Sequence, residues 1–185
     1  RFGVLSSSPA GGDLLFDDKL CEQGRNFCNK MWNGLRLLKG LEVEPALAQP
    51  AENTYATQWI TSRLNEILEE TNKDYNQYRL SDVTIKLYSF VWNDFFSWYL
   101  EMIKPVYGHP VDAKTLGEAL ALYEQICILL HPLMPFITEE IWHQIKERSE
   151  DEVCMLATYP KVGAIDAFQL KNVDYETHLN VLSIG

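Results

Sequence analysis

Seven polar or flexible residues share one side of a segment whose apolar spacing predicts a helix. At 100° per residue they fall within a sector of about 100°: Glu22, Arg25, Asn26, Asn29, Asn33, Arg36 and Gly40, here called the polar stripe. Asparagine is a poor helix former, and a merely solvated surface gains nothing from three asparagines at this spacing. Amide and guanidinium groups in one row are suited to hydrogen bonding with a partner, and nucleic acid is the leading candidate.

Charge is distributed unevenly around this stripe. The whole chain has a formal net charge of −10. The segment from residue 19 to residue 40 nevertheless holds one acidic residue and five basic ones, which are Lys19, Arg25, Lys30, Arg36 and Lys39. Phosphate neutralisation needs Lys and Arg, so an acidic body with one basic helix favours a local, oriented contact over wrapping.

A structural role is the alternative for the stripe, because buried Asn and Arg side chains can fix the register of a helical bundle. Arg25, Asn26 and Asn29 suit this role as well as they suit contact with a partner. In that case they would be tied to acidic residues such as Glu101. Asn33 and Arg36 lie nearer to the helix end, and we expect them to contact the partner.

Other residues with catalytic or metal-binding potential do not form a complete motif. Glu140 and His143 have the Glu-x-x-His spacing of di-iron bundles, but the sequence has no second such pair. Gly11-Gly12 lacks the rest of a phosphate-binding loop. The cysteines lack zinc-site spacing and are expected to be free thiols in a reducing cytoplasm; they are Cys21, Cys28, Cys127 and Cys154. The sequence predicts no metal site and no catalytic centre.

Two further features have a structural and a functional interpretation. His131 precedes a proline between two helices, where we expect it to hydrogen-bond a backbone group. The aromatic series from Tyr88 to Tyr99 could stack nucleic-acid bases, but its apolar density favours packing in the core.

Apolar periodicity and capping residues predict an all-α fold. The first helix runs from about Asp18 to Lys39, with Asp17 or Asp18 as its cap and Gly40 as its stop. Three more helices are predicted at about 54–77, 81–104 and 113–130. Thr138 is expected to cap a fifth helix that ends near Arg148, with acidic residues in its first turn (Glu139 and Glu140).

The remaining segments are predicted to be irregular. A cluster of Ser, Pro and Gly marks residues 1–17 as a loop or linker, and residues 41–53 as a whole are expected to be a connector. Residues 153–158 suggest a short strand or an extended packing segment. The prediction is an antiparallel bundle of about five helices over 18–150, followed by an extended C-terminal segment over 151–185.

Length and composition suit one domain with a sizeable core. The 185 residues are 46% apolar and include five tryptophans. No apolar run is long enough to span a bilayer, and the chain opens with no signal peptide. We expect a cytoplasmic protein without a membrane partner. The first residue is Arg1 and not Met, which suggests a piece of something longer.

Three segments resemble one family closely. Residues 25–33 read RNFCNKMWN, residues 92–105 read WNDFFSWYLEMIKP, and residues 131–142 read HPLMPFITEEIW. They look like the anticodon-binding domain of class I valyl-tRNA synthetases, although isoleucyl and leucyl relatives share the last motif. Residues 1–17 are similar to the family's link from the catalytic domain. The resemblance covers about residues 1–168.

The resemblance implies a helical bundle that holds the anticodon stem-loop of a valine tRNA. A separate Rossmann domain, absent from this chain, would activate valine with ATP and magnesium, so the chain alone would hold no cofactor. It implies a monomer whose only other partner is that catalytic domain. It also implies a set of RNA-binding residues, which are Arg25, Asn29, Lys30, Asn33, Arg36, Leu37 and Lys39.

Within that set, the resemblance implies different roles. Asn33 and Arg36 match the part of the first bundle helix that faces the anticodon, and Lys30 and Lys39 would meet phosphates. Many members carry an aromatic residue where this chain has Leu37, which shifts base stacking toward the Arg36 guanidinium plane.

The tail departs from the family pattern. Residues 169–185 resemble a segment expected several tens of residues later, so we hypothesise that the sequence joins two pieces between Phe168 and Gln169. Outside the valine family, an isoleucyl or leucyl relative is the nearest alternative. A helical protein-interaction module with an acidic face would show a large exposed apolar patch, and a metal-dependent bundle enzyme would bind metal.

Overall fold

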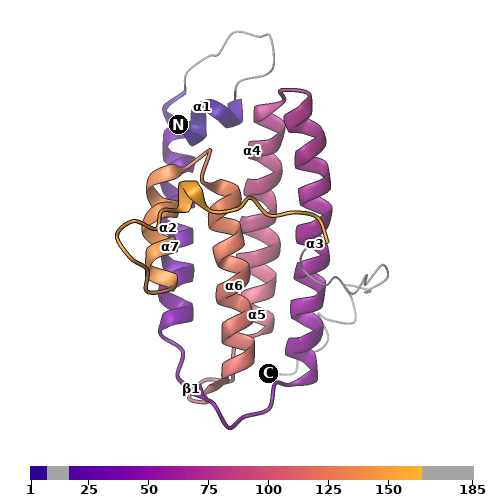
Figure 1. The fold of residues 1–185 in the computed structure, drawn as a ribbon, viewed down its shortest axis with the longest axis vertical. Coiled ribbons are helices and arrows are strands. Elements are labelled where there is room, and N and C mark those ends of the chain that lie inside the picture. Colours follow the sequence, from indigo (N-terminus) through magenta and orange to yellow (C-terminus); the bar gives the residue numbers. More distant parts are fainter. Residues whose placement is uncertain (8–16, 164–185) are drawn as a thin grey trace.

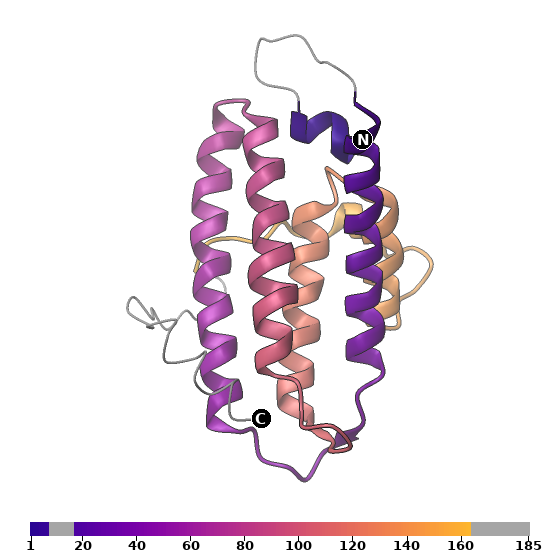
Figure 2. The same ribbon diagram turned by 180° about the vertical axis from the view of Figure 1, so that it is seen from behind.

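The computed structural model describes residues 1–7 and 17–163, and long antiparallel helices dominate it (Figure 1). The predicted all-α bundle is confirmed. Its long helices are α2 (Asp18–Lys39), α3 (Ala51–Asn76), the continuous run α4 (Leu80–Ser89), η1 (Phe90–Tyr99) and α5 (Leu100–Met102), and α6 (Ala113–Leu130). A shorter helix, α7 (Pro135–Ile145), packs against α6 and α2, and Figure 2 shows the arrangement from behind.

Helix α2 begins and ends where the sequence predicts. The Asp17 carboxylate accepts a hydrogen bond from the Lys19 backbone N–H at 2.9 Å, which satisfies an otherwise unpaired donor of the first turn. At the other end the Gly40 N–H donates to the Arg36 carbonyl at 3.0 Å. Apolar residues opposite the polar stripe are buried at Phe27, Met31, Leu35 and Leu38, and half-buried at Leu20.

The aromatic helix is buried as predicted, but its middle is a π-helix, which the sequence reasoning missed. Buried neighbours recur as Phe90–Val91, Phe95–Phe96 and Tyr99–Leu100, at intervals of five and then four residues. That spacing exceeds the 3.6-residue period of an α-helix and suits the wider π-helical turn. The π-helical geometry therefore keeps each buried pair on the core side of the helix.

Three segments have a different secondary structure from the one predicted. Helix α1 (Phe2–Ser7) lies in the predicted loop, and its Phe2 ring packs 5.3 Å from that of Phe27 in the core. The predicted connector 41–53 contains strand β1 (Val43–Glu44), which pairs in parallel with β2 (Val111–Asp112). Residues 153–158, predicted as a short strand or an extended packing segment, instead contain a short 3-10 helix, η2 (Cys154–Leu156), between the extended residues Val153 and Ala157.

Helix α7 begins at Pro135, so Thr138 lies inside the helix and does not cap it. The buried Thr138 hydroxyl donates to the Met134 carbonyl at 2.9 Å, which occupies the group that a cap would use. Glu139 and Glu140, which are predicted in the first turn, therefore lie beyond it. Proline at the first helical position explains the earlier start.

Some predictions concern residues outside the described ranges. The junction between Phe168 and Gln169, the Gly11-Gly12 pair and the part of the C-terminal segment beyond Gly163 all lie there. Within residues 1–7 and 17–163, no helix has both the length and the hydropathy needed to cross a bilayer.

Helices α2 and η1 approach closely at Gly34. A Cβ atom built on Gly34 would clash with the Phe96 ring and lie 2.8 Å from its Cδ1 atom. Gly117 in α6 offers a contrast, because nothing lies within 4 Å of a Cβ atom built there. One glycine therefore permits helix packing, and the other only lowers helix propensity.

We expect Gly34→Ala and Gly117→Ala to change stability in opposite directions. Gly34→Ala should lower the free energy of unfolding by about 1–3 kcal/mol, because the new methyl group overpacks the contact with Phe96. Gly117→Ala should raise it by about 0.4–1 kcal/mol through better helix propensity and a less flexible unfolded chain. Urea unfolding of both variants measures the difference, and equal stabilities would contradict the packing described here.

Candidate nucleic-acid interface

The polar stripe of α2 faces solvent. The side chains of Arg25, Asn26, Asn29, Asn33 and Arg36 are all exposed. On the opposite face the Tyr123 hydroxyl of α6 donates to the Met31 carbonyl at 2.6 Å, which ties α2 to the bundle. Burial of that face forces the stripe outward, because helical geometry fixes the angle between them.

Hydrogen bonding between helices does not account for the stripe. Within the described part of the chain, Asn26, Asn29, Asn33 and Arg36 make no side-chain hydrogen bond and no ion pair. The structural alternative is therefore wrong for the asparagines. Their amide groups are available to a partner.

The predicted tie between Arg25 and Glu101 is also wrong. Arg25 pairs with Glu22 on its own helix at 3.3 Å, and both side chains are more than half exposed. Glu101 pairs with Lys104 at 3.4 Å in α5, which lies toward the other end of the bundle (Figure 1). An exposed pair such as Arg25–Glu22 contributes little to stability, so Arg25 can exchange this partner for another anion.

The other predicted RNA-binding residues already have protein contacts. The Lys30 ammonium lies 5.3 Å from the centre of the Trp92 ring, in a cation–π arrangement. Leu37 is half-buried and packs against the core. Lys39 donates to the Gln144 carbonyl at 3.1 Å, at the end of α7. The predicted set thus lies on or beside one helix face, with Asn29, Asn33 and Arg36 least engaged by protein.

This arrangement is chemically suited to an anion with hydrogen-bonding edges. Guanidinium groups donate several parallel hydrogen bonds, and carboxamides both donate and accept. Arg36 and Lys39 lie in the last turn of α2. Such groups can contact phosphates and base edges together.

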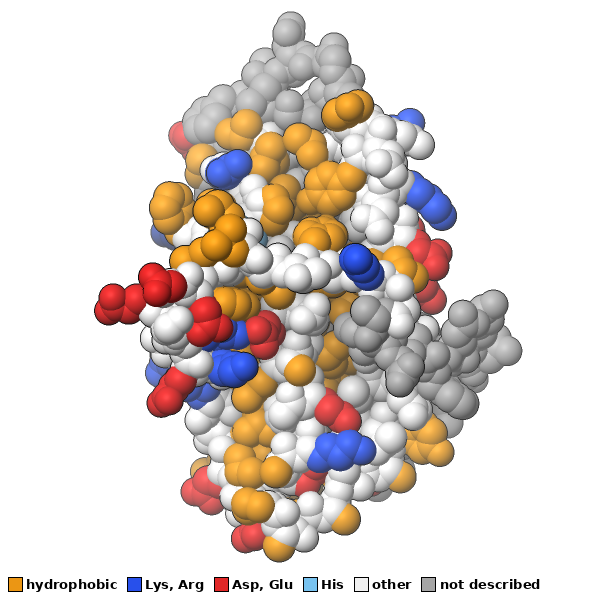
Figure 3. Space-filling model, in the orientation of Figure 1, with side chains coloured by type: hydrophobic (Ala, Val, Ile, Leu, Met, Phe, Trp, Pro, Cys, Tyr) orange, Lys and Arg blue, Asp and Glu red, His pale blue; other side chains and the backbone are white. Residues whose placement is uncertain are grey.

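Apolar side chains are also exposed, at the end of the bundle near α1. A groove of about 340 Å³ runs between α1, the start of α2 and the segment 133–137, with Phe136 91% exposed beside it. Figure 3 shows hydrophobic side chains gathered over the upper part of this face. An exposed apolar area is what the protein-interaction hypothesis predicts.

The Glu140–His143 pair considered for a metal does not form. His143 Nε2 instead lies 3.1 Å from Glu139 Oε1, and Glu140 accepts a hydrogen bond from Gln144. His131 also departs from expectation, because its Nδ1 contacts the Thr138 hydroxyl at 2.9 Å and not a backbone group. The early start of α7 brings Thr138 to the end of α6.

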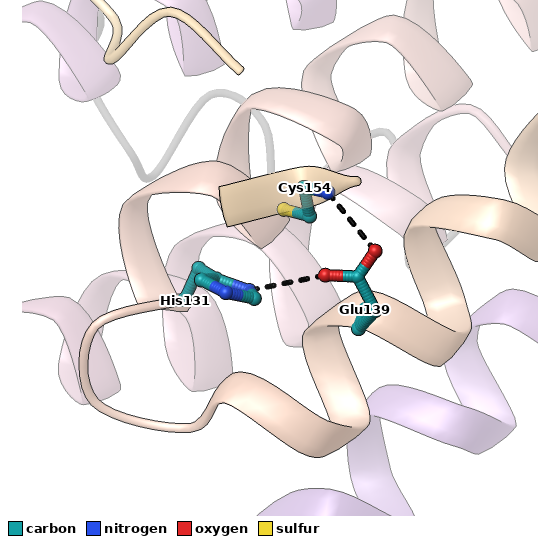
Figure 4. A group of neighbouring side chains, drawn as sticks. All are labelled: His131, Glu139 and Cys154. Carbon is teal, nitrogen blue, oxygen red and sulfur yellow. Dashed lines mark hydrogen bonds and ion pairs between the residues drawn. The ribbon is translucent and has the colours of Figure 1, made fainter. Parts of the chain in front are cut away.

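A second group of reactive side chains escaped the sequence analysis. His131, Glu139 and Cys154 place potential ligand atoms within 4.8 Å of one another (Figure 4). Glu139 Oε2 lies 3.9 Å from His131 Nδ1, and Glu139 Oε1 accepts a hydrogen bond from the Cys154 backbone N–H at 2.9 Å. Burial, and then the neighbouring Glu139 charge, raise the pKa of Cys154 to about 12. The three residues come from separate segments, so no local spacing could reveal them.

Comparison with known proteins places the chain in a family. Residues 57–183 match the model of the "Anticodon-binding domain of tRNA ligase". The chain therefore belongs to the family of anticodon-binding domains of tRNA ligases.

Several relatives carry the name "Valine--tRNA ligase". That of Porphyromonas gingivalis is 45% identical over 174 residues, which cover 94% of this chain and 20% of the relative. That of Christiangramia forsetii is 43% identical over 175 residues, which cover 95% of this chain and 20% of the relative. That of Bacteroides fragilis is 41% identical over 184 residues, which cover 99% of this chain and 21% of the relative. The chain spans about a fifth of the length of these relatives.

Exposure of the stripe leads to a stability prediction. Asn33→Ala and Arg36→Ala should each change the free energy of unfolding by less than about 0.5 kcal/mol, because neither side chain supports the bundle. Leu35→Ala, in the same turn but buried, should lower it by about 2–5 kcal/mol. Thermal and urea unfolding test this contrast. A loss of more than 1 kcal/mol for Asn33→Ala would restore the structural interpretation.

Proposed function

We propose that this chain binds the anticodon stem-loop of a tRNA through the exposed face of α2. The observation that carries the proposal is the exposed row of Asn29, Asn33 and Arg36, which have no hydrogen-bonding partner within the described part of the chain. Family membership supports RNA as the ligand, and the names of the relatives favour valine tRNA over isoleucine or leucine tRNA.

Recognition follows from the groups on the helix. Single-stranded loops splay their bases, which proteins read by stacking on planar side chains and by hydrogen bonds to base edges. The Arg36 guanidinium offers both a plane and several donors, and the Asn33 carboxamide matches a base edge. Leu37 is half-buried and supplies an apolar border in place of a stacking ring.

The two lysines beside this row contact the phosphate backbone in our proposal. Lys39 would exchange its hydrogen bonds to Gln144 for a phosphate, and Lys30 would do so from its position over Trp92. Phosphate contacts set position and orientation, whereas base contacts supply sequence preference. The surrounding acidic surface disfavours RNA elsewhere on the domain.

In this proposal the chemistry belongs to the rest of a longer polypeptide. The relatives are about five times as long as the matched region, and a catalytic domain there would use ATP and magnesium to charge the tRNA. The apolar groove beside α1, with Phe136 at its border, favours contact with that remainder, because contiguous exposed apolar surface marks interaction sites. The protein would act as a monomer in the cytoplasm.

Arg36→Ala should weaken binding of the valine anticodon stem-loop by about 1–3 kcal/mol, the scale of one good base contact. Filter binding at fixed moderate salt measures the effect, with a scrambled-loop RNA for comparison. Arg79→Ala is the matched control, because it removes the same charge from an exposed residue between α3 and α4. An equal loss of affinity in both variants would mean that only net charge matters. Unchanged affinity in Arg36→Ala would contradict the proposed contact between Arg36 and the RNA.

Lys39→Ala should weaken binding of the cognate and scrambled loops equally. It should also reduce the slope of log K against log salt concentration by about one, as expected for one phosphate contact. A salt titration with both RNAs measures this. A change in preference between the two loops would instead assign Lys39 to base recognition. Comparing valine and isoleucine stem-loops with the unmodified protein tests the choice of tRNA.

A further inference from the structure

We propose that His131, Glu139 and Cys154 form a binding site for a divalent cation of the zinc type. The three side chains supply an imidazole nitrogen, a carboxylate oxygen and a thiol sulfur, all within 4.8 Å (Figure 4). Zinc binds these three ligand types together, whereas harder cations such as magnesium prefer oxygen alone. The site shares no residue with the polar stripe, so it is independent of RNA binding.

The hydrogen bonds around the cluster orient its ligands. The Thr138 hydroxyl lies 2.9 Å from both His131 Nδ1 and the Met134 carbonyl oxygen. The same nitrogen faces Glu139 Oε2 at 3.9 Å, so these contacts hold the imidazole ring against the cluster. An outer partner of this kind is typical of metal-binding histidines.

Glu139 is held in a similar way. Its Oε1 atom contacts the Cys154 backbone N–H at 2.9 Å and His143 Nε2 at 3.1 Å. Its Oε2 atom makes no hydrogen bond within the described residues and lies 3.9 Å from His131 Nδ1. One oxygen therefore fixes the carboxylate, and the other is directed into the cluster.

The Cys154 thiol is buried at the edge of the cluster and belongs to the hydrophobic core. The residue is 2% exposed, and its sulfur has no hydrogen-bonding partner in the part of the chain that the structure describes. Beside a carboxylate and an imidazole, the sulfur has the surroundings of a metal ligand. On binding, the S–H bond breaks, the sulfur–metal bond forms and the proton leaves to solvent.

A cavity reaches two of the three proposed ligands, His131 and Glu139, and Cys154 is not among its lining residues. It measures about 370 Å³ and is bordered by His131, Glu139, Val153 and Met155. Three protein ligands beside an accessible cavity leave a fourth position for water or a small ligand, as in open zinc sites. Because the ligands come from the end of α6, from α7 and from η2, the ion would fasten these three segments together.

Cobalt(II) titration of the metal-stripped 185-residue chain tests the proposal. A thiolate ligand gives a sulfur-to-cobalt charge-transfer band in the near-ultraviolet, and we expect it to saturate at one ion per chain. Zinc should then displace cobalt and abolish the band. Zinc should also raise the midpoint of thermal unfolding, because it binds only the folded arrangement.

Variants assign the band to the cluster. Cys154→Ala and Cys154→Ser should both lose it, whereas Cys21→Ala, which removes an exposed thiol elsewhere, should keep it. Glu139→Gln retains an oxygen acceptor for the Cys154 N–H and so preserves the local fold, but it should weaken cobalt binding by more than about tenfold. Circular dichroism confirms that each variant is folded.

Three results would overturn the proposal. They are the absence of the band from the unmodified chain, its persistence in Cys154→Ala, and its loss in Cys21→Ala. The first would leave a hydrogen-bonded contact between helices and nothing more. The other two would assign the metal to another thiol.

Discussion

The structure depends on how closely the apolar face of α2 packs against the aromatic residues of η1. Gly34 carries no Cβ atom that would keep the Phe96 ring away, and the Tyr123 hydroxyl holds the same stretch of α2 from the α6 side. These contacts fix the rotation of α2 about its own axis. Once that rotation is fixed, residues on the opposite side of α2 must face solvent. The exposed polar stripe is thus a consequence of core packing.

The sequence predicts the helices whose ends are marked by local chemistry. Asp17 and Gly40 bound α2, and Asp112 caps α6 by accepting from the Thr115 N–H at 2.8 Å. Prediction fails where distant contacts decide. The π-helical geometry of η1 accompanies pairs of buried residues that face the core, and α1 packs its Phe2 ring against Phe27 of α2. Both features depend on contacts with other helices, which a short stretch of sequence does not reveal.

The candidate RNA-binding face is predicted better in its direction than in its contacts. Helical periodicity alone indicates that Asn33 and Arg36 share a face, and the structure shows that face exposed. The contacts of the neighbouring lysines are not predicted. The position of Lys30 over Trp92 and the hydrogen bond from Lys39 to Gln144 both depend on how the helices cross. For the same reason, the sequence does not predict the cluster of His131, Glu139 and Cys154. Its members meet only after α7 folds back onto α6 and η2 lies across both.

Ion pairing explains how an acidic protein can present a positive surface. Several basic side chains elsewhere in the bundle are neutralised locally. Arg63 pairs with Glu66 and Asp94, and Lys86 pairs with Asp74 and Glu70.

Arg148 is neutralised in the same way, and it is also buried. Its side chain is only 2% exposed, pairs with Glu124 and stacks on the Trp142 ring at 3.5 Å. By contrast, Lys30, Arg36 and Lys39 have no acidic partner at ion-pair distance among the described residues. The net charge of −10 therefore conceals an uncompensated positive row on α2. A polyanion would meet attraction there and repulsion over most of the remaining surface, which selects both the binding face and the orientation of the ligand.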